Sequence, residues 1–376
     1  MIPALAVAEA LSARGAEVSF IAPRGSGAAG LAARNGYPED TIPLRGLDRR
    51  PSLRNVRTLV QAVLAVPRAR RIIRRRRADV VIGGGGYMAA PAAVAARLRR
   101  RPVLLTEADS HLGVANRAAA PLATRVALAF PLVGRAGPRY MVTGRPVRRA
   151  VRDATRTGGR RRLGIAPDAT TVLIFGGSQG ARSLNLAAAE AFGDGPPFEL
   201  IHVAGPGQVD DVRRLLARRG AGPRYRLEGF LDDLPSAIAA ADLVVCRSGG
   251  SVFELAAIGR PAILVPYPHA AGDHQAKNAR WLAEAGGAVV LADEACTGPR
   301  LRELVGALLA DRQRLDAMGV AAASVGRPDA ADEVADVAIR IAKPRRAGRR
   351  RRFRVPRPRR PRMHLPRVRL PRRRSG

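Results

Sequence analysis

A short β-branched run stops at a cluster of glycines in each half of the chain. The first reads Asp79-Val-Val-Ile-Gly-Gly-Gly-Gly-Tyr87, and the second reads Thr170-Thr-Val-Leu-Ile-Phe-Gly-Gly-Ser-Gln-Gly-Ala181. A buried strand, a turn too tight for side chains and a helix start together place backbone N–H groups and a helix dipole where they face an anion. Two such sites in succession predict a cleft that holds a phosphate-bearing ligand on each wall.

A third segment carries the most specific pattern of side chains. It reads Asp242-Leu-Val-Val-Cys-Arg-Ser-Gly-Gly-Ser-Val-Phe-Glu-Leu-Ala-Ala257, in which a strand leads directly into a helix. Its small residues let the backbone approach a ligand. Glu254 lies in the first helical turn, where a carboxylate can accept hydrogen bonds from two vicinal hydroxyls, as on a ribose. The alternative is that Glu254 only complements the helix dipole.

Two further helix starts hold groups that suit a phosphorylated sugar. Ser178 follows the second glycine run, where its hydroxyl can cap the helix or contact a phosphate. His274 and Gln275 open another helix and can donate hydrogen bonds to sugar hydroxyls. Solvated residues at a helix start would show the same pattern, so a purely structural role stays open for all three.

Several common ways of binding a nucleotide are absent from the sequence. No Gly-x-x-x-x-Gly-Lys-Ser/Thr motif occurs, and the glycines at 176, 177 and 180 do not have the dinucleotide-binding spacing. No two aspartates lie two residues apart, so the simplest metal–diphosphate clamp is missing. Backbone N–H groups and arginines are therefore expected to hold the diphosphate, with no metal or other cofactor. Cys246 and Cys296 suggest neither a disulfide framework nor a zinc site, and they favour a reducing cytosol.

Strand and helix patterns alternate along the chain, which predicts parallel sheets covered by helices on both faces. The pattern pauses near Gly144 and restarts at residue 171, so we expect an α/β protein with two doubly wound domains. The expected divisions are 1–145, 146–342 and a disordered tail at 343–376. Strands are expected at 17–22, 79–82, 102–106, 171–175, 199–203, 225–229, 243–246, 262–266 and 288–291, and helices at 3–14, 55–77, 89–100, 299–311 and 328–342.

The formal net charge of +34 is distributed unevenly. Residues 343–376 hold sixteen arginines, one lysine, six prolines and no acidic residue, a composition that cannot bury enough surface to fold. Such a cation suits anionic lipid headgroups or nucleic acid, or it is a solvated appendage without a partner. No apolar run reaches the ~18 residues of a membrane span. The helix at 59–73 with its arginines predicts either contact with anionic lipid or an ordinary buried helix with a solvated charge run.

Four motifs together resemble the MurG family, the peptidoglycan glycosyltransferases that add N-acetylglucosamine to lipid I. They are Gly-Gly-Ser-Gln-Gly-Ala at 176–181, Cys-Arg-Ser-Gly at 246–249 with Glu254, Asp-His-Gln-Ala-Lys-Asn-Ala at 273–279 and Gly-Gly-Tyr-x-x-x-Pro at 85–91. The resemblance runs in order through residues 2–340. It implies the GT-B architecture, in which two Rossmann-like domains hold the active site between them. It also implies transfer with inversion from UDP-N-acetylglucosamine to the undecaprenyl-diphosphate-linked muramoyl-pentapeptide, without an obligatory metal.

The resemblance also assigns site residues. On the donor side, Ser178 would lie near the diphosphate, Leu231 at the uracil, Glu254 at the ribose hydroxyls and Gln275 at the amino sugar. The full set that the resemblance places around the donor is Arg148, Ser178, Gln179, Leu231, Ser251, Glu254, His274 and Gln275. On the acceptor side it places Gly84, Gly85, Gly86, Tyr87 and Asp109, with Glu107 as a possible catalytic carboxylate.

The chain departs from the family pattern in three places. It begins inside a loop of the type Gly-Gly-Thr-Gly-Gly-His, so a strand and the histidine often proposed as catalytic are missing. The catalytic group is therefore unknown, and we expect a misassigned start codon or a fragment with little catalysis. Asp109 in Thr106-Glu-Ala-Asp109 replaces the family's asparagine and turns a hydrogen-bond donor into a charge. The stretch 248–254 is one residue shorter than the family pattern, so contacts of residues 250–252 transfer less safely than that of Glu254.

The partners that the resemblance implies are UDP-N-acetylglucosamine, lipid I and the anionic inner-membrane surface. It implies a peripheral protein on the cytoplasmic face of the cell membrane that serves peptidoglycan synthesis, and with it cell-wall biogenesis, cell shape and division. Nucleic acid is not an expected partner.

Three other functions stay open at this point. A related glycosyltransferase could act on a different lipid, such as diacylglycerol, with the same donor-side motifs. A UDP-N-acetylglucosamine 2-epimerase would share the architecture and need no lipid acceptor. A non-catalytic paralogue would bind the nucleotide-sugar or act as a basic scaffold on nucleic acid, without turnover.

Overall fold

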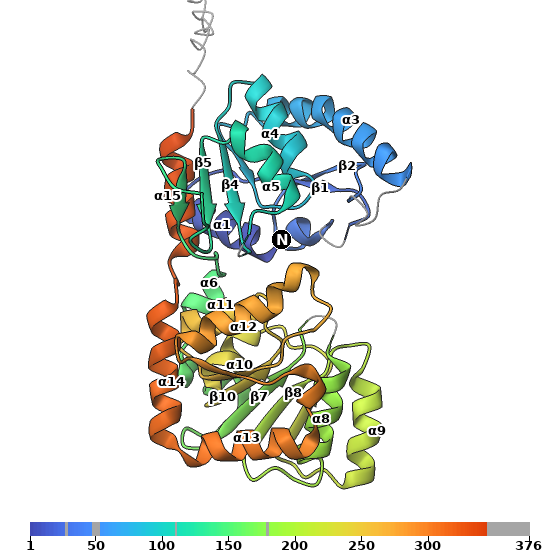
Figure 1. Cartoon of the computed structure of the whole chain (residues 1–376), viewed down its shortest axis with the longest axis vertical. Coiled ribbons are helices and arrows are strands. Elements are labelled where there is room, and N and C mark those ends of the chain that lie inside the picture. The colour runs from blue at the N-terminus through green and yellow to red at the C-terminus, as the bar shows by residue number, and fades with distance from the viewer. Residues whose placement is uncertain (27–28, 47–52, 110, 178–179, 344–376) are drawn as a thin grey trace, which may run out of the picture. The chain divides into compact units, whose positions relative to one another are not determined.

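The chain folds into strands and helices that alternate, and every strand pairs in parallel with its neighbours (Figure 1). The computed structural model describes residues 1–26, 29–46, 53–109, 111–177 and 180–343. The predicted tail, apart from Lys343, lies outside the described residues. None of the helices that the structure describes is both long and apolar enough to cross a bilayer.

Two lobes follow one another along the chain. The first lobe, residues 1–142, contains α1 (Ile2–Ala13), β1 (Phe20–Pro23), α2 (Leu31–Arg34), β2 (Glu39–Ile42), α3 (Leu53–Arg75), β3 (Val81–Gly83), α4 (Ala89–Leu98), β4 (Val103–Glu107), α5 (Val114–Ala119), β5 (Arg125–Leu128) and β6 (Tyr140–Val142).

The second lobe, residues 149–325, contains α6 (Arg149–Arg152), α7 (Arg156–Leu163), β7 (Thr171–Phe175), α8 (Arg182–Phe192), β8 (Glu199–Val203), α9 (Val209–Arg219), β9 (Tyr225–Glu228), α10 (Leu234–Ala240), β10 (Leu243–Cys246), α11 (Ser251–Ile258), β11 (Ala262–Leu264), α12 (His274–Glu284), β12 (Ala288–Val290), α13 (Gly298–Ala310) and α14 (Arg312–Val325). A last helix, α15 (Ala330–Ile341), follows both lobes.

The sheet of the second lobe has the strand order β12-β11-β10-β7-β8-β9. The chain starts at β7, adds β8 and β9 on one side, and then returns to add β10, β11 and β12 on the other. Strand order therefore reverses between β7 and β10. In open parallel sheets, ligands bind in the crevice beyond the carboxyl ends of the two strands at such a switch point.

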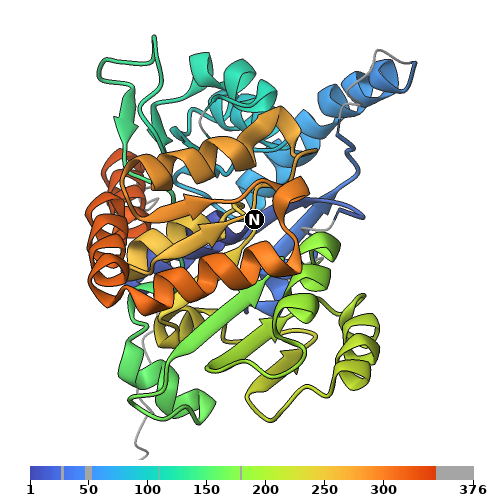
Figure 2. The ribbon, with the colours of Figure 1, turned by 60° about the horizontal axis from the view of Figure 1, so that its bottom comes forward.

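Side chains of alternate residues in β7 enter two different apolar cores. Val172 and Ile174 pack in a cluster with α8, α9 and α13, whereas Leu173 and Phe175 pack in a cluster with α10, α11 and α12. Figure 2 shows α12 and α13 with strands of the sheet between them. Burial on both faces explains why this strand is apolar throughout instead of alternating with polar residues.

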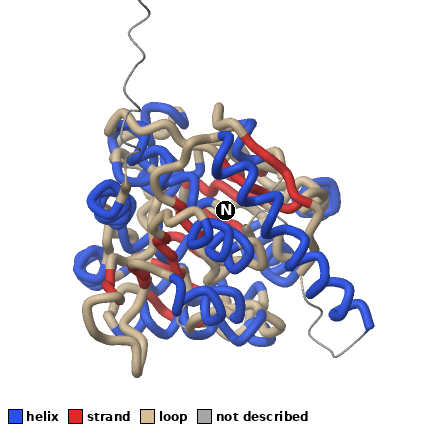
Figure 3. Tube along the Cα trace, turned by 90° about the horizontal axis from the view of Figure 1, so that it is seen from above, coloured by secondary structure: helices blue, strands red, loops and turns tan. Residues whose placement is uncertain are grey.

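The strands of the first lobe form a sheet in the order β3-β4-β5-β6 and a separate pair, β1-β2. Apolar side chains of α3, α4 and the sheet form a third core that includes Ala65, Ala69, Ile73 and Val103. The amino end of α3 extends beyond the rest of the lobe (Figures 1 and 3).

The last helix returns to the first lobe. Val334, Ala335 and Ala338 of α15 pack against Val7 and Leu11 of α1 in a common core. Arg14 at the end of α1 also pairs with Asp332 and Asp336. The predicted domain boundaries stay a prediction, and we propose that residues 330–341 belong with the first lobe instead of with 146–342.

The α/β architecture with two doubly wound halves is confirmed. The predicted strands at 171–175, 199–203 and 243–246 have the bounds of β7, β8 and β10. The other predicted strands and helices are present with ends shifted by a few residues, as for 17–22, observed at 20–23. Neither the strands β2, β5 and β6 nor the helices α2, α5, α6, α7 and α14 were predicted from the sequence. The strands and most of these helices are short, whereas α14 buries Leu315, Met318 and Ala322 at helical spacing, a pattern that the prediction missed.

A buried carboxylate holds the start of β10. Asp242 accepts a hydrogen bond from the backbone N–H of Thr171 at 2.9 Å and pairs with Arg160 at 3.0 Å and Arg156 at 2.7 Å. Burial alone would raise the pKa of Asp242, but the Thr171 hydrogen bond and the guanidinium groups outweigh it and hold the pKa below its ordinary value. These contacts tie β10 to β7 and α7, and so position the residues that follow β10.

We predict that Asp242→Asn lowers the free energy of unfolding by about 3 kcal/mol at neutral pH, because it leaves buried guanidinium charge unpaired. A carboxylate whose pKa is depressed on folding stabilises the protein above its unfolded pKa, and this stability is lost as pH falls through the folded pKa. Denaturant titrations at several pH values should therefore show a smaller loss on acidification in the variant. Asp316→Asn is the matched control, because Arg312 pairs with both Asp242 and Asp316, but Asp316 is 68% exposed. An equal effect of both substitutions would contradict this account.

Candidate active site

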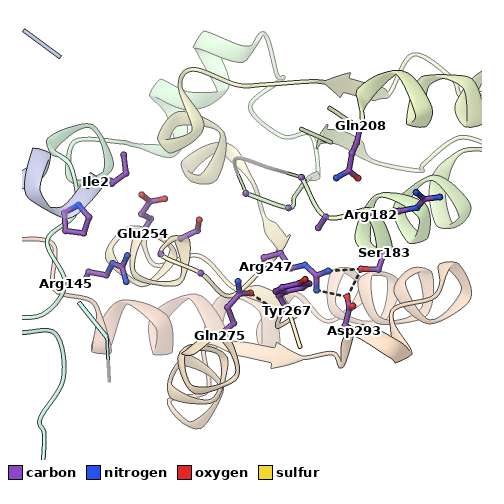
Figure 4. Close-up of a pocket in the computed structure, with 18 of the residues that line it drawn as sticks. Ile2, Arg145, Arg182, Ser183, Gln208, Arg247, Glu254, Tyr267, Gln275 and Asp293 are labelled. Carbon is purple, nitrogen blue, oxygen red and sulfur yellow. Dashed lines mark hydrogen bonds and ion pairs between the residues drawn. The ribbon is translucent and has the colours of Figure 1, made fainter. Parts of the chain in front are cut away.

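A cavity of about 1140 Å³ opens at the switch point of the second sheet. Its walls come from the segments after β7 and β10, from the start of α1 and from the segment between the lobes (Figure 4). The lining residues are Ile2, Pro3, Arg145, Pro146, Val147, Gly176, Gly177, Gly180, Ala181, Arg182, Ser183, Leu186, Gln208, Arg247, Gly249, Gly250, Ser251, Glu254, Tyr267, Gln275 and Asp293.

The loop after β7 brings bare backbone to the cavity. A Cβ at Gly176 would lie 2.3 Å from the backbone nitrogen of Ala181, and a Cβ at Gly180 would lie 2.3 Å from the carbonyl oxygen of Ala204. No side chain fits at either position. Helix α8 begins immediately afterwards, and exposed Arg182 adds a cation at its amino end. Such an arrangement can receive an anion, and the phosphate site at this loop stays a prediction. Two predicted donor residues of the loop, Ser178 and Gln179, lie outside the described residues.

An ion-pair network closes the floor of the cavity. Arg247, which follows β10, donates to Asp293 at 2.6 Å and to the Ser183 hydroxyl at 2.8 Å, and Ser183 donates to Asp293 at 2.6 Å. Arg247 also donates to the carbonyl oxygen of Val265, and its guanidinium lies 5.6 Å from the centre of the Tyr267 ring. Figure 4 shows these residues together at one end of the site. The network fixes the end of β10 to the starts of α8 and of the segment before α13.

Glu254 lies at the opposite end of the view in Figure 4, beside Arg145. It belongs to the first turn of α11, and Ser251 opens the same helix and also lines the cavity. Burial raises the pKa of Glu254, while the charges of Arg145 and Arg148 oppose the rise. No hydrogen bond to Glu254 is found among the described residues, so its carboxylate oxygens can accept hydrogen bonds from a ligand.

Arg145 connects the two lobes at the cavity. Its Nη1 donates to the carbonyl oxygen of Ala108 at 3.3 Å and lies 3.8 Å from the carboxylate of Asp109, both in the loop after β4. On its other side the guanidinium stacks 5.1 Å from the centre of the Phe253 ring and touches the space beside Gly250. Asp109 replaces the family's neutral asparagine by a negative charge. Arg145, from the segment between the lobes, places a positive charge beside it.

Predicted donor residues divide into two groups. Ser251, Glu254 and Gln275 line the cavity, and the Gln275 side-chain oxygen accepts a hydrogen bond from the backbone N–H of Tyr267 at 3.0 Å. Arg148, Leu231 and His274 do not line it. Arg148 donates to Glu9 of α1 at 2.8 Å, Leu231 packs against the core of the second lobe, and His274 starts α12. Their roles toward a donor stay predictions.

Four of the predicted acceptor-side residues, Gly84, Gly85, Gly86 and Tyr87, form the loop after β3, and Asp109 follows β4. Gly85 and Gly86 have φ values of +81° and +69°, which an L side chain rarely adopts, and a Cβ at Gly84 would lie 3.3 Å from Ala4 of α1. Tyr87 packs against the core of the first lobe. None of these residues lines the cavity, and the same holds for Glu107 and Asp109.

Glu107 organises the loop after β4. Its two carboxylate oxygens accept hydrogen bonds from the backbone N–H groups of Asp109 and Gly113 at 3.2 and 2.9 Å, and from the Asn116 amide at 2.9 Å. The residue is 7% exposed. These contacts make Glu107 a positioning residue for the loop that carries Asp109.

The sequence analysis did not assign a role to several lining residues. Arg145 lies in the Gly144-Arg-Pro-Val147 stretch, where the strand–helix pattern pauses, and Arg182 directly follows the glycine loop. Position next to these two breaks in the pattern was the available signal. Arg247 stood inside a quoted motif. No local sequence pattern distinguishes the remaining lining residues from other polar residues of the chain. These are Ser183, Gln208, Tyr267 and Asp293. Within the described residues no group of three or more His, Cys, Asp or Glu side chains could hold a metal ion.

Comparison with known proteins places both lobes in one family. The model for the glycosyltransferase family 28 N-terminal domain matches residues 1–128, and the model for the family 28 C-terminal domain matches residues 171–334. A UDP-N-acetylglucosamine–N-acetylmuramyl-(pentapeptide) pyrophosphoryl-undecaprenol N-acetylglucosamine transferase from Desulforudis audaxviator is 37% identical over 355 residues, which cover 90% of this chain and 95% of the relative.

Solved structures agree with this placement. MurG of Acinetobacter baumannii has 30% sequence identity and a TM-score of 0.70, with 90% of this chain and 95% of that chain covered. A UDP-N-acetylglucosamine 2-epimerase from Neisseria meningitidis reaches a TM-score of 0.62 at 14% identity, covering 90% and 96% of the two chains, and therefore shares the fold alone. The predicted resemblance is confirmed by the transferases and not by fold likeness in general: the chain belongs to the MurG family of glycosyltransferases.

Proposed function

We propose that this chain transfers N-acetylglucosamine from UDP-N-acetylglucosamine to lipid I. Its relatives are named for this reaction, and the cavity at the switch point has the groups that the donor requires. The observation that carries the proposal is that one cavity brings together the glycine loop after β7 and the carboxylate of Glu254 after β10. An anion site and a hydroxyl-binding carboxylate in one cavity fit a nucleoside diphosphate.

The two ends of the cavity suggest how the donor lies. The diphosphate would face Gly176, Gly177 and Gly180 and the amino end of α8, where backbone N–H groups and Arg182 offer positive charge. The ribose hydroxyls would donate to Glu254. As the glycosidic bond breaks, negative charge develops on UDP, and fixed donors and cations at this position stabilise the transition state more than the ground state.

The acceptor would enter from the first lobe. Its end of the cavity is formed by Ile2 and Pro3 of α1, and Arg145 connects this side to the loop of Asp109. The glycine loop at 83–86, behind α1, is proposed to receive the lipid diphosphate. Both oxygens of Glu107 are already hydrogen-bonded, so we assign it a positioning role and do not assign the group that accepts the proton.

Membrane contact is proposed for the amino half of α3. Leu59 and Val63 are 58% and 70% exposed, and Val56, Val60 and Leu64 are exposed beside them. The arginines of the 68–77 stretch lie in the carboxyl half of the helix and directly after its end, and Arg75 and Arg76 pair with Asp40. Apolar side chains next to cations suit an anionic lipid surface, which would bring the protein to its lipid-linked acceptor as a peripheral protein.

Transfer of radioactive N-acetylglucosamine tests the reaction. The purified protein should label lipid I and leave diacylglycerol unlabelled, and it should release no free N-acetylmannosamine from the donor. Labelling of diacylglycerol would favour the related lipid glycosyltransferase, and N-acetylmannosamine would favour the epimerase. Calorimetric binding of UDP without any turnover on lipid I would indicate a non-catalytic paralogue.

The α3 surface is tested by vesicle sedimentation. The double substitution Leu59→Gln and Val63→Gln should weaken binding to vesicles that contain anionic lipid by at least roughly tenfold, because two exposed side chains can no longer bury apolar area. Val320→Gln is the matched control, since Val320 is 73% exposed on α14. Equal vesicle binding by the wild-type protein and the double variant would contradict the proposal.

Glu254→Gln separates binding from stability. It should weaken UDP-N-acetylglucosamine binding by roughly tenfold, because hydrogen bonds to a charged acceptor are lost. The pKa of Glu254 is raised on folding, so its ionised form destabilises the native state, and this cost grows as pH rises through the folded pKa. The variant should therefore melt at the same temperature as the wild-type protein or higher at neutral pH. Calorimetric titration and thermal melts measure the two effects.

The pH dependence provides the control for that assignment. Wild-type donor affinity should fall as pH drops through the pKa of Glu254, and Glu254→Gln should lack this fall. Arg145→Met should move the midpoint to higher pH, because a cation that opposes the raised pKa of Glu254 is gone. Arg149→Gln should leave the midpoint in place, since Arg149 pairs with exposed Asp153 on its own helix. A midpoint unchanged by Arg145→Met would contradict the electrostatic account.

A further inference from the structure

A chain of buried polar side chains crosses the core of the second lobe. His202 of β8 is fully buried, with Nδ1 2.7 Å from the Tyr225 hydroxyl and Nε2 3.1 Å from the Asn185 side-chain oxygen. Asn185 on α8 is 2% exposed and Tyr225 on β9 is 8% exposed. The proposed reaction makes no use of these three side chains.

Tyr225, His202, Asn185 and Gln208 form a relay of hydrogen bonds. In this relay each donor and each acceptor is determined by the neighbouring bond. Both N–H groups of the Asn185 amide are used, one by the carbonyl oxygen of Ala204 at 2.8 Å and one by the Gln208 side-chain oxygen at 2.9 Å. The Asn185 oxygen must therefore accept from His202 Nε2–H. Burial lowers the pKa of His202 to about 3, so the ring is neutral and its Nδ1 accepts from Tyr225.

The relay ends at the cavity. Gln208 immediately precedes α9 and lines the cavity, near Arg182 in Figure 4. Because its oxygen is turned toward Asn185, its NH₂ group is turned toward the glycine loop. A Cβ at Gly180 would lie 2.9 Å from the Gln208 nitrogen, so the amide packs directly against the loop.

We propose that Gln208 is a positioning and specificity-determining residue, whose amide is oriented by Tyr225, His202 and Asn185 so that N–H groups face the glycine loop and the phosphates bound there. This inference rests on the proposed function. A carbonyl oxygen in the same place would repel the diphosphate, whereas an N–H group favours it. A side-chain amide can flip, exchanging its oxygen and its NH₂ group, at little steric cost. A fixed neighbour is therefore needed to hold it in one orientation.

A buried polar cluster could also exist only to satisfy its own hydrogen bonds. Such a cluster would affect every ligand of the lobe alike, through its stability. A group that faces phosphate affects only ligands that carry phosphate. The ratio of UDP affinity to uridine affinity therefore distinguishes the two roles, because uridine shares the base and ribose and lacks the diphosphate.

Two substitutions test the relay. Gln208→Glu replaces the NH₂ group by a carboxylate oxygen with almost no change in shape. Asn185→Asp keeps an acceptor for His202 but removes the N–H group that donates to the Gln208 oxygen. The Gln208 amide should therefore flip, so that its oxygen faces the glycine loop. Gln313→Glu is the control for added charge, because Gln313 is exposed on α14.

NMR titrations of the full chain with UDP and with uridine, at one fixed ionic strength, give the readout. Gln208→Glu should weaken UDP binding by at least roughly tenfold while uridine binding is unchanged. Asn185→Asp should shift the ratio in the same direction, and Gln313→Glu should not shift it. If Asn185→Asp does not fold, Gln208→Glu decides alone, since it alters a cavity wall and not the core.

The contrary outcomes are distinct. If wild-type protein prefers UDP to uridine and Gln208→Glu keeps the wild-type ratio, this inference is wrong while the proposed function stands. An equal loss of UDP and uridine affinity would show a structural role and overturn it as well. If the wild-type protein has no preference for UDP, the phosphate site itself is refuted, and the proposed function falls together with the inference.

Discussion

The site depends on one steric constraint, the close approach of backbone to backbone where β7 ends. At Gly176 and Gly180 any side chain would overlap main-chain atoms of Ala181 and Ala204. The wall of the cavity there is therefore made of the peptide backbone itself, and α8 starts at once behind it. Strand order reverses between β7 and β10, so the two connections diverge and leave space for a ligand. The cavity follows from this topology and this turn together.

Ion pairs and burial determine where charged side chains lie around the cavity. The chain carries 65 lysines and arginines, and most are ordinary surface cations, so abundance says little about function. The arginines at the cavity differ because each has fixed surroundings. Arg247 is neutralised by Asp293 and holds the end of β10, while Arg145 lies between Glu254 and the loop of Asp109. The proposed dianionic donor would be able to approach the carboxylate of Glu254 because a cation lies beside it.

The two lobes are linked by segments that follow or leave one lobe and pack against the other. Helix α15 follows the second lobe yet buries its apolar face against α1 of the first, and Arg148 and Arg145 leave the connecting segment to contact first-lobe residues. A contact between residues such as Arg148 and Glu9, 139 positions apart, has no local sequence pattern. The family resemblance alone placed Arg148 near the donor, and the cavity is lined by Arg145, three residues earlier.

Sequence alone determined the local features of this protein: apolar runs that form strands, glycines that end them, helices that start directly after, and the placement of Glu254 in a first turn. These follow from periodicity and from backbone sterics, which act over a few residues. The strands at 171–175 and 243–246 were predictable for that reason. The family resemblance, and not periodicity, assigned Ser251, Glu254 and Gln275 to the donor side, and all three line the cavity. Only the tertiary structure decided which of many arginines face the cavity, where α15 packs, and which way the buried amides of Asn185 and Gln208 point. Those depend on contacts between distant segments, because the orientation of a polar side chain is set by the partners that folding brings to it.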